Sequence, residues 1–168
     1  MTMTALKMPP KTKVYEALSA LADGRVRIKG PNEAAVVSSG GDRTYSVRWS
    51  DDMRVISSND NASYWQGYMG YPVVAVLLAL GKVGFDAEAA KSLAGIPWRQ
   101  VNDRFKRDYA KAVDFVLEEL AAKGHDRAAI VREVESIYGQ LAELRLERGP
   151  RTEPPPKAPR QRRPDEPV

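Results

Sequence analysis

The spacing of hydrophobic residues changes twice along this chain, and that change limits the fold more than any other feature of the sequence. Val14, Leu18 and Leu21 recur at the spacing of one helical face. Over residues 25–56 the apolar positions alternate with polar ones, in four short segments separated by turns. Helical spacing returns over residues 72–144. The sequence therefore predicts an α+β fold in which a small four-stranded antiparallel sheet has helices packed on one face.

The element boundaries follow from turn and capping residues. The predicted strands cover residues 25–29, 33–39, 44–50 and 53–56. The predicted helices cover residues 11–22, 72–80, 85–93 and 97–123, and the last of these opens at a proline and closes at a glycine. We expect the chain to divide into a flexible N-terminus (1–10), an α+β nucleic-acid-binding domain (11–123), a zipper-like helix (126–147) and a tail (149–168).

The last helix carries a narrow apolar stripe. Its members follow one another at intervals of four, three, four and three residues, and they are Ile130, Val134, Ile137, Leu141 and Leu144. That spacing is the heptad seam of a coiled coil, so the helix is predicted to pair with a second copy of the chain. An amphipathic helix packed on its own domain is the alternative.

The C-terminal tail has a composition unlike the rest of the chain. From Gly149 onward, seven of twenty residues are proline and five are Lys or Arg. Such a segment has little to bury and is predicted to be disordered.

Composition excludes several classes of protein. The chain has no cysteine and one histidine, His125, so disulfides and Cys/His zinc sites are not expected. No apolar run reaches membrane-spanning length and the N-terminus does not resemble a signal peptide, so the cytoplasm is the expected location. No phosphate-binding glycine loop or catalytic motif is present, and we expect a non-enzyme that needs no cofactor or metal.

Aromatic residues concentrate in one segment after the predicted strands. Tyr64, Trp65, Tyr68 and Tyr71 fall within eight positions, although the whole chain has only thirteen aromatic residues. Unpaired nucleic-acid bases stack on such rings, which makes the cluster a candidate binding surface. The alternative is that the rings fill the core beneath the sheet.

Basic residues alternate along the predicted strands of a chain with a net charge of +4. The candidates for contacting phosphates are Arg25, Arg27, Lys29, Arg48 and Arg54. An ordinary solvated strand face would look the same. A weaker possibility is a duplex-binding helix-turn-helix at residues 90–101, in which Arg99, Gln100 and Asn102 would read base edges.

Two families resemble this chain. The stretch from Tyr45-Ser-Val-Arg-Trp to Gly70-Tyr-Pro-Val-Val-Ala-Val-Leu-Leu is similar in layout to a SWIM zinc finger, but residues 56–58 and 70–72 lack every metal ligand. That likeness implies a metal-free protein-interaction or transcription-associated scaffold.

Residues 11–147 are more similar to ThermoDBP, the single-stranded DNA-binding proteins of thermophilic archaea that lack an OB fold. The likeness rests on the order of elements and on the heptad seam. It implies a basic, aromatic-lined cleft, a zipper-like dimerisation helix and a role in DNA replication and repair. The leading hypothesis is a homodimer that binds and protects single-stranded DNA, or alternatively RNA, without strong sequence preference.

Overall fold

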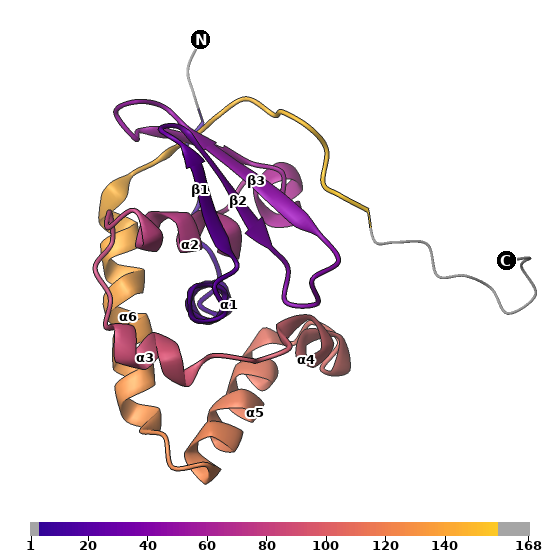
Figure 1. The fold of residues 1–168 in the computed structure, drawn as a ribbon, viewed down its shortest axis with the longest axis vertical. Coiled ribbons are helices and arrows are strands. Elements are labelled where there is room, and N and C mark those ends of the chain that lie inside the picture. The colour runs from indigo at the N-terminus through magenta and orange to yellow at the C-terminus, as the bar shows by residue number, and fades with distance from the viewer. Residues whose placement is uncertain (1–3, 158–168) are drawn as a thin grey trace, which may run out of the picture.

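The computed structural model describes residues 4–157 and confirms an α+β architecture (Figure 1). Its sheet has five strands in the order β1-β2-β3-β4-β5. The strands are β1 (Val26–Gly30), β2 (Glu33–Val37), β3 (Thr44–Trp49), β4 (Val55–Ser58) and β5 (Glu147–Arg148). The first four form the antiparallel meander predicted from the alternating residues.

The fifth strand corrects the prediction of a four-stranded, wholly antiparallel sheet. β5 pairs with β4 in parallel, with Val55 opposite Glu147 and Ile56 opposite Arg148. The Glu147 amide donates to the Arg54 carbonyl at 2.8 Å, and the Gly149 amide donates to the Ile56 carbonyl at 2.8 Å. Two residues are too short a segment to display an alternating pattern, so this strand could not be predicted from periodicity.

The helices form layers beneath one face of the sheet. They are α1 (Thr12–Ala22), α2 (Tyr71–Ala79), α3 (Ala87–Ser92), α4 (Trp98–Arg104), α5 (Tyr109–Ala122) and α6 (Arg127–Leu144). Helix α2 contacts β1 to β4 on one side and α1 on the other. It is buried from Pro72 to Leu78 because apolar residues surround its whole circumference. Helices α3, α5 and α6 pack around α1.

The single long helix predicted for residues 97–123 is wrong. The chain breaks between α4 and α5, where Lys106 and Arg107 adopt positive φ angles of 51° and 64°. Asp108 then caps α5, because its side chain accepts a hydrogen bond from the Lys111 amide at 3.2 Å. The apolar spacing continues across the break because both helices bury one face in the same core.

Helix α6 corrects the coiled-coil prediction. Four seam residues, Ile130, Val134, Ile137 and Leu141, are buried within this chain, and Leu144 packs against the same core. They face α1, α3 and α5. A seam that is already covered inside one chain cannot also pair with a second α6, so the alternative reading of this stripe is the one observed.

The described parts of both terminal segments contact the rest of the protein. Leu6 is buried, and its amide donates to the Leu146 carbonyl at 2.8 Å, beside an isolated bridge between Ala5 and Glu147. Residues 149–157 have no regular secondary structure but lie against the protein. The remaining predictions for the termini concern residues 1–3 and 158–168, which lie outside the described part of the chain.

Within residues 4–157, no helix has both the length and the apolar content required to cross a membrane.

Candidate functional site

A polar cleft of about 590 Å³ opens between one end of the sheet and the helices. Its walls come from α1, the β2–β3 connection, the segment before α2, α4 and the start of α5. The lining residues are Lys13, Glu16, Ser38, Ser39, Arg43, Tyr45, Asn61, Ala62, Trp65, Gln66, Tyr68, Tyr71, Arg99, Asn102, Asp103, Arg107 and Tyr109. We refer to this set as the cleft.

Three of the four predicted aromatic residues line the cleft. Trp65 lies at its rim with 58% of its surface exposed, whereas Tyr68 and Tyr71 are partly buried in its wall. The Tyr71 ring packs edge-on against Tyr45, with 6.1 Å between centroids. Tyr64 stands beside the cleft in edge-to-face contact with Trp65 at 4.6 Å. The cluster thus contains one exposed ring, Trp65, and three partly buried rings.

A π-helical turn, η1 (Ala62–Gln66), carries the rings of Tyr64 and Trp65. It ends at Gly67, whose φ of 73° is in the left-handed region that favours glycine. The Ser63 amide donates to Asp60 Oδ1 at 3.0 Å, and the Gly70 amide donates to Ser63 Oγ at 3.2 Å. A Cβ at Gly70 would lie only 1.9 Å from Asp60 Oδ1, so this close packing requires glycine. These contacts fix the position of η1 relative to α2.

Four cations line the cleft, and they come from four separate parts of the chain. They are Lys13, Arg43, Arg99 and Arg107. Arg107 is one of two successive non-glycine residues with positive φ, a costly backbone conformation that occurs frequently at binding sites. Arg99 forms an ion pair with Asp42 at 2.6 Å, and its side chain is 40% exposed. Sequence reasoning missed Lys13, Arg43 and Arg107 as a group because no spacing along the chain connects them.

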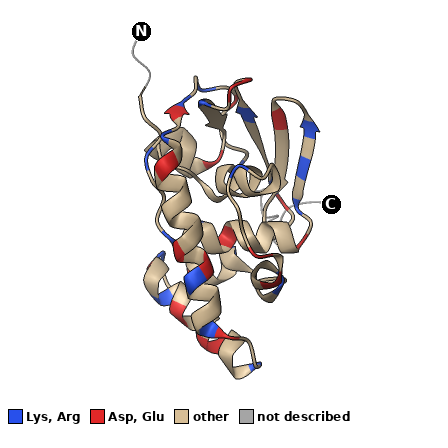
Figure 2. Ribbon diagram, turned by 90° about the vertical axis from the view of Figure 1, so that its left-hand side faces the viewer, with Lys and Arg blue, Asp and Glu red and all other residues tan. Residues whose placement is uncertain are grey.

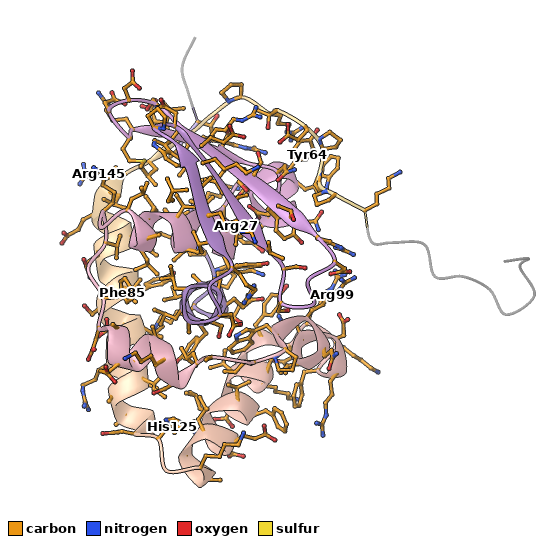
Figure 3. All side chains as sticks on the ribbon, in the orientation of Figure 1. Arg27, Tyr64, Phe85, Arg99, His125 and Arg145 are labelled. Carbon is orange, nitrogen blue, oxygen red and sulfur yellow. The ribbon has the colours of Figure 1, made fainter. Side chains whose placement is uncertain are left out.

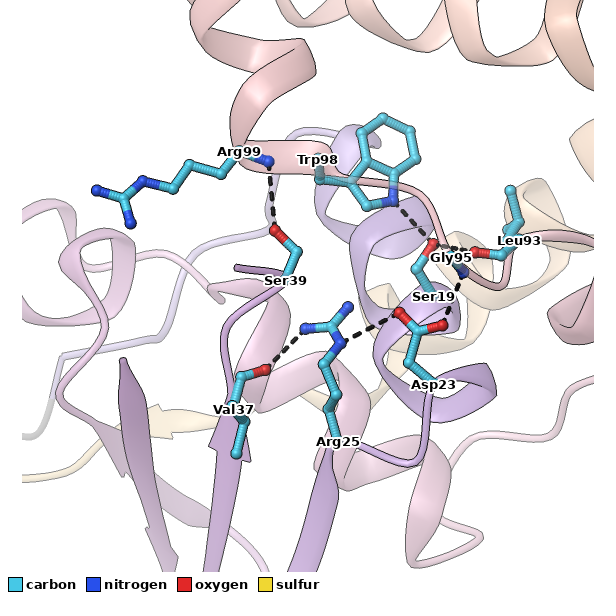
Figure 4. A network of polar contacts seen from close by, with 9 residues as sticks. All are labelled: Ser19, Asp23, Arg25, Val37, Ser39, Leu93, Gly95, Trp98 and Arg99. Carbon is cyan, nitrogen blue, oxygen red and sulfur yellow. Dashed lines mark hydrogen bonds and ion pairs between the residues drawn. The ribbon is translucent and has the colours of Figure 1, made fainter. Parts of the chain in front are cut away.

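A network of hydrogen bonds holds α4 against α1 and the sheet, and so shapes the cleft (Figure 4). The buried Trp98 donates from Nε1 to Ser19 Oγ at 2.8 Å, and Ser19 donates to the Leu93 carbonyl at 2.7 Å. Asp23 accepts from the Gly95 amide at 2.7 Å and from Arg25 Nε at 3.2 Å. The start of α4 is therefore tied to α1 and β1.

The inner wall of the cleft carries a buried ion pair. Lys13 Nζ lies 3.3 Å from Glu16 Oε2, and both side chains are largely buried. Asn102 Nδ2 donates to Glu16 Oε1 at 3.2 Å. Burial raises the pKa of Glu16, and Lys13 and Asn102 offset only part of that effect. Burial is the largest single influence on the pKa of Lys13 and lowers it, but Glu16, Tyr109 and Tyr68 together outweigh burial and leave the Lys13 pKa above its usual value.

Tyrosines in the cleft are also affected by their surroundings. Burial raises the pKa of Tyr68 and of Tyr71, with Tyr45 contributing a further increase at Tyr71. Both hydroxyl groups are therefore neutral at physiological pH. Neutral phenol rings can stack on bases without repelling the phosphates that accompany them.

The sheet-face cations predicted from the sequence, Arg25, Arg27, Lys29, Arg48 and Arg54, lie outside the lining of the cleft. The Arg25 guanidinium already has two partners within the chain, because it donates to Asp23 and to the Val37 carbonyl, the latter at 2.7 Å. Arg48 lies 3.7 Å from both Glu33 and Glu153. Arg27 and Lys29 are exposed on β1 and form no ion pair with any residue in the described range. Figure 2 shows basic residues along the strands and both signs along the long helices.

The described part of the tail reaches the aromatic rim of the cleft. The Arg151 guanidinium lies over the rings of Tyr64 and Trp65, at 5.1 and 5.8 Å from their centroids. Asn59 Nδ2 donates to the Pro154 carbonyl at 3.4 Å. Arg148 donates to the Tyr64 carbonyl as well, so β5 and the tail both contact the segment that presents the rings.

The helix-turn-helix candidate is placed differently from a base-reading helix. Helix α4 has seven residues, Arg99 is paired with Asp42, and Asn102 is buried at the cleft wall.

His125 lies at the far end of the molecule from Tyr64 and Arg99 (Figure 3). Over residues 4–157 no three His, Cys, Asp or Glu side chains cluster in a way that could hold a metal ion.

Comparison with known proteins identifies the family but not the activity. No curated protein and no solved structure matches the chain. No comparison links it to ThermoDBP or to SWIM-type fingers, so both resemblances remain predictions. A family model matches residues 6–147, a range that includes every residue lining the cleft. The chain belongs to the family described as Uncharacterised conserved protein UCP014422.

Proposed function

We propose that this protein binds single-stranded nucleic acid in the cleft, with DNA as the expected ligand. The observation that carries the proposal is that one cleft combines Trp65, Tyr68 and Tyr71 with four cationic side chains. Proteins that bind single strands without sequence specificity combine the same two elements, a basic groove and rings on which bases stack.

The division of labour follows from the chemistry of each group. Trp65 is the most exposed ring and offers a stacking face worth about 1–3 kcal/mol per base. Arg107 is exposed at the cleft and can meet a phosphate, whereas Arg99 would first have to exchange its Asp42 partner. A duplex keeps its bases stacked on each other, so it can use the cations but not the rings. We therefore expect the cleft to bind single strands with higher affinity than duplexes.

The sheet-face cations contribute in a second way under this proposal. Arg27, Lys29 and Arg54 are the exposed members without an ion pair among the described residues, and they would raise the local concentration of a polyanion. Arg25 and Arg48 already have internal partners, and contacts from them to phosphate would require those partners to be exchanged.

Tryptophan fluorescence tests the proposal directly. Trp49 and Trp98 are buried, so a fluorescence change on adding a single-stranded oligonucleotide should come from Trp65. We expect quenching in the parent protein and little change in Trp65→Phe, although Trp65→Phe retains a ring and should still bind. Parent fluorescence that stays constant while binding is detected by anisotropy would place the strand away from Trp65.

A further inference from the structure

The inner wall of the cleft carries hydrogen-bonding atoms with no partner in the described structure. Glu16 is 6% exposed and Asn102 is 9% exposed, and each lines the cleft. Asn102 Oδ1 and Glu16 Oε2 accept no hydrogen bond, although Glu16 Oε2 retains its ion-pair distance to Lys13. Arg43 Nε, on the same cleft, is buried and donates none. Buried polar atoms without partners are rare in folded proteins because each is costly.

The chemistry of these atoms selects a class of ligand. Asn102 Oδ1 has no partner, and Glu16 Oε2 has only the Lys13 ammonium at 3.3 Å, so both acceptors favour a group that carries N–H donors. A phosphate placed beside Glu16 would meet a carboxylate, so the inner wall does not suit an anion, whereas Arg99 and Arg107 do. The tyrosines of the cleft favour a planar ring over an aliphatic amine. The single donor, Arg43 Nε, suits a ring nitrogen or carbonyl acceptor on the same ligand.

We propose that the inner cleft receives one unstacked nucleobase that bears an exocyclic amino group, held by Asn102 Oδ1 and the Glu16 carboxyl group. Guanine, adenine and cytosine present such an amino group, whereas thymine presents carbonyl oxygens in the corresponding positions. The inference rests on the proposed single-strand binding and adds a local base preference to it. The positioning contact from Asn102 Nδ2 to Glu16 keeps both acceptors in fixed orientations.

The test uses pairs of ligands that differ only by an amino group. Oligothymidines would carry one central guanine or hypoxanthine, or one central adenine or unsubstituted purine. We expect the parent protein to bind the amino-bearing member of at least one pair about tenfold more tightly by fluorescence anisotropy. In Asn102→Leu that ratio should fall to about one. The inference is overturned if the parent protein binds the two members of each pair with equal affinity, even if all the oligonucleotides bind.

A second measurement separates failure of this inference from failure of the proposed function. If no oligonucleotide binds, the single-strand proposal is contradicted, and the pocket is then judged with mononucleotides alone. Deoxyguanosine monophosphate should shift the side-chain amide resonance of Asn102 in NMR spectra more than deoxyinosine monophosphate does. Equal shifts, or no shift with either, would overturn the pocket as well.

Discussion

The cleft and the outer sheet face both gather basic residues, but they differ in how those residues are held. On the sheet face the cations lie on or directly before β1, β3 and β4, and Arg48 has two acidic neighbours at 3.7 Å in exposed positions. In the cleft the cations converge from separate elements onto aromatic rings and a buried Lys13–Glu16 pair. The sheet face is an exposed charged surface. The cleft is a partly enclosed site whose wall contains buried polar atoms without hydrogen-bond partners.

The difference matters because the same charge has different effects in the two places. Exposed charges are screened by water and salt, and they attract an anion without orienting it. Charges beside buried rings act on a ligand that has already lost part of its water, so they can fix its position.

The largest difference is expected in stability. Glu16→Ala would leave Lys13 buried without its partner, and we expect the free energy of unfolding to fall by about 3–5 kcal/mol. Glu33→Ala, which removes an exposed partner of Arg48, should cost less than about 1 kcal/mol. Urea denaturation of both variants measures the contrast. Equal losses would mean that the cleft ion pair is no more enclosed than the sheet pair.

Loss of an exposed ring should separate the two regions in binding. Trp65 and Ile28 are both large, apolar and exposed, one at the cleft rim and one on β1. Trp65→Ala should weaken single-strand binding by about 1–3 kcal/mol, because a stacking face is lost. Ile28→Ala should leave the affinity almost unchanged. Titration with a labelled oligonucleotide decides, and similar losses in both variants would shift the interface toward β1.

Salt dependence should distinguish cations that contact phosphate from those that only attract it. Arg107→Ala should flatten the log–log dependence of affinity on salt by about 0.7, the value for one neutralised phosphate on a single strand. Arg27→Ala should flatten it by much less, since Arg27 lies outside the cleft lining. Affinities measured across a range of salt concentrations give both slopes. A larger change of slope in Arg27→Ala than in Arg107→Ala would place the phosphate contacts on the sheet face, as the alternating basic residues predicted.

The smallest effect concerns alkaline stability. Burial raises the pKa of Tyr71, so its contribution to stability is complete below the ordinary tyrosine pKa of 10.0 and declines as pH rises toward the folded-state value. The unfolding free energy should therefore fall above about pH 10, and Tyr71→Phe should reduce that fall. Lys13 contributes in an overlapping range because its pKa is also raised. Identical pH profiles for parent and variant would show that Tyr71 ionises freely.

The sequence predicted local features of the fold well, because periodicity reports which face of an element is buried. β1 to β4, α1 and α2 were all expected close to their observed positions. Periodicity does not report what covers that face. The Ile130–Leu144 stripe was therefore assigned to a second chain, when α1, α3 and α5 cover it within the same chain.

The candidate site was only half visible in the sequence. Trp65, Tyr68 and Tyr71 were recognisable because they are close together along the chain. Arg43 comes from the β2–β3 connection, and Asn102 comes from α4, which hydrogen bonds to Ser19 and Glu16 hold against α1. No local sequence pattern encodes that these segments meet the rings. The break at Lys106–Arg107 was missed for a related reason, since positive φ at non-glycine residues has no reliable sequence signal.

Competition between single-stranded and duplex DNA measures whether unpaired bases enter the cleft. The protein would be saturated with a labelled single strand, then titrated with unlabelled single strand or with the same sequence as a duplex at fixed salt. We expect the single strand to displace the label at clearly lower concentration than the duplex, because only unpaired bases can reach Trp65 and Tyr68. Displacement by the duplex at equal or lower concentration would contradict it.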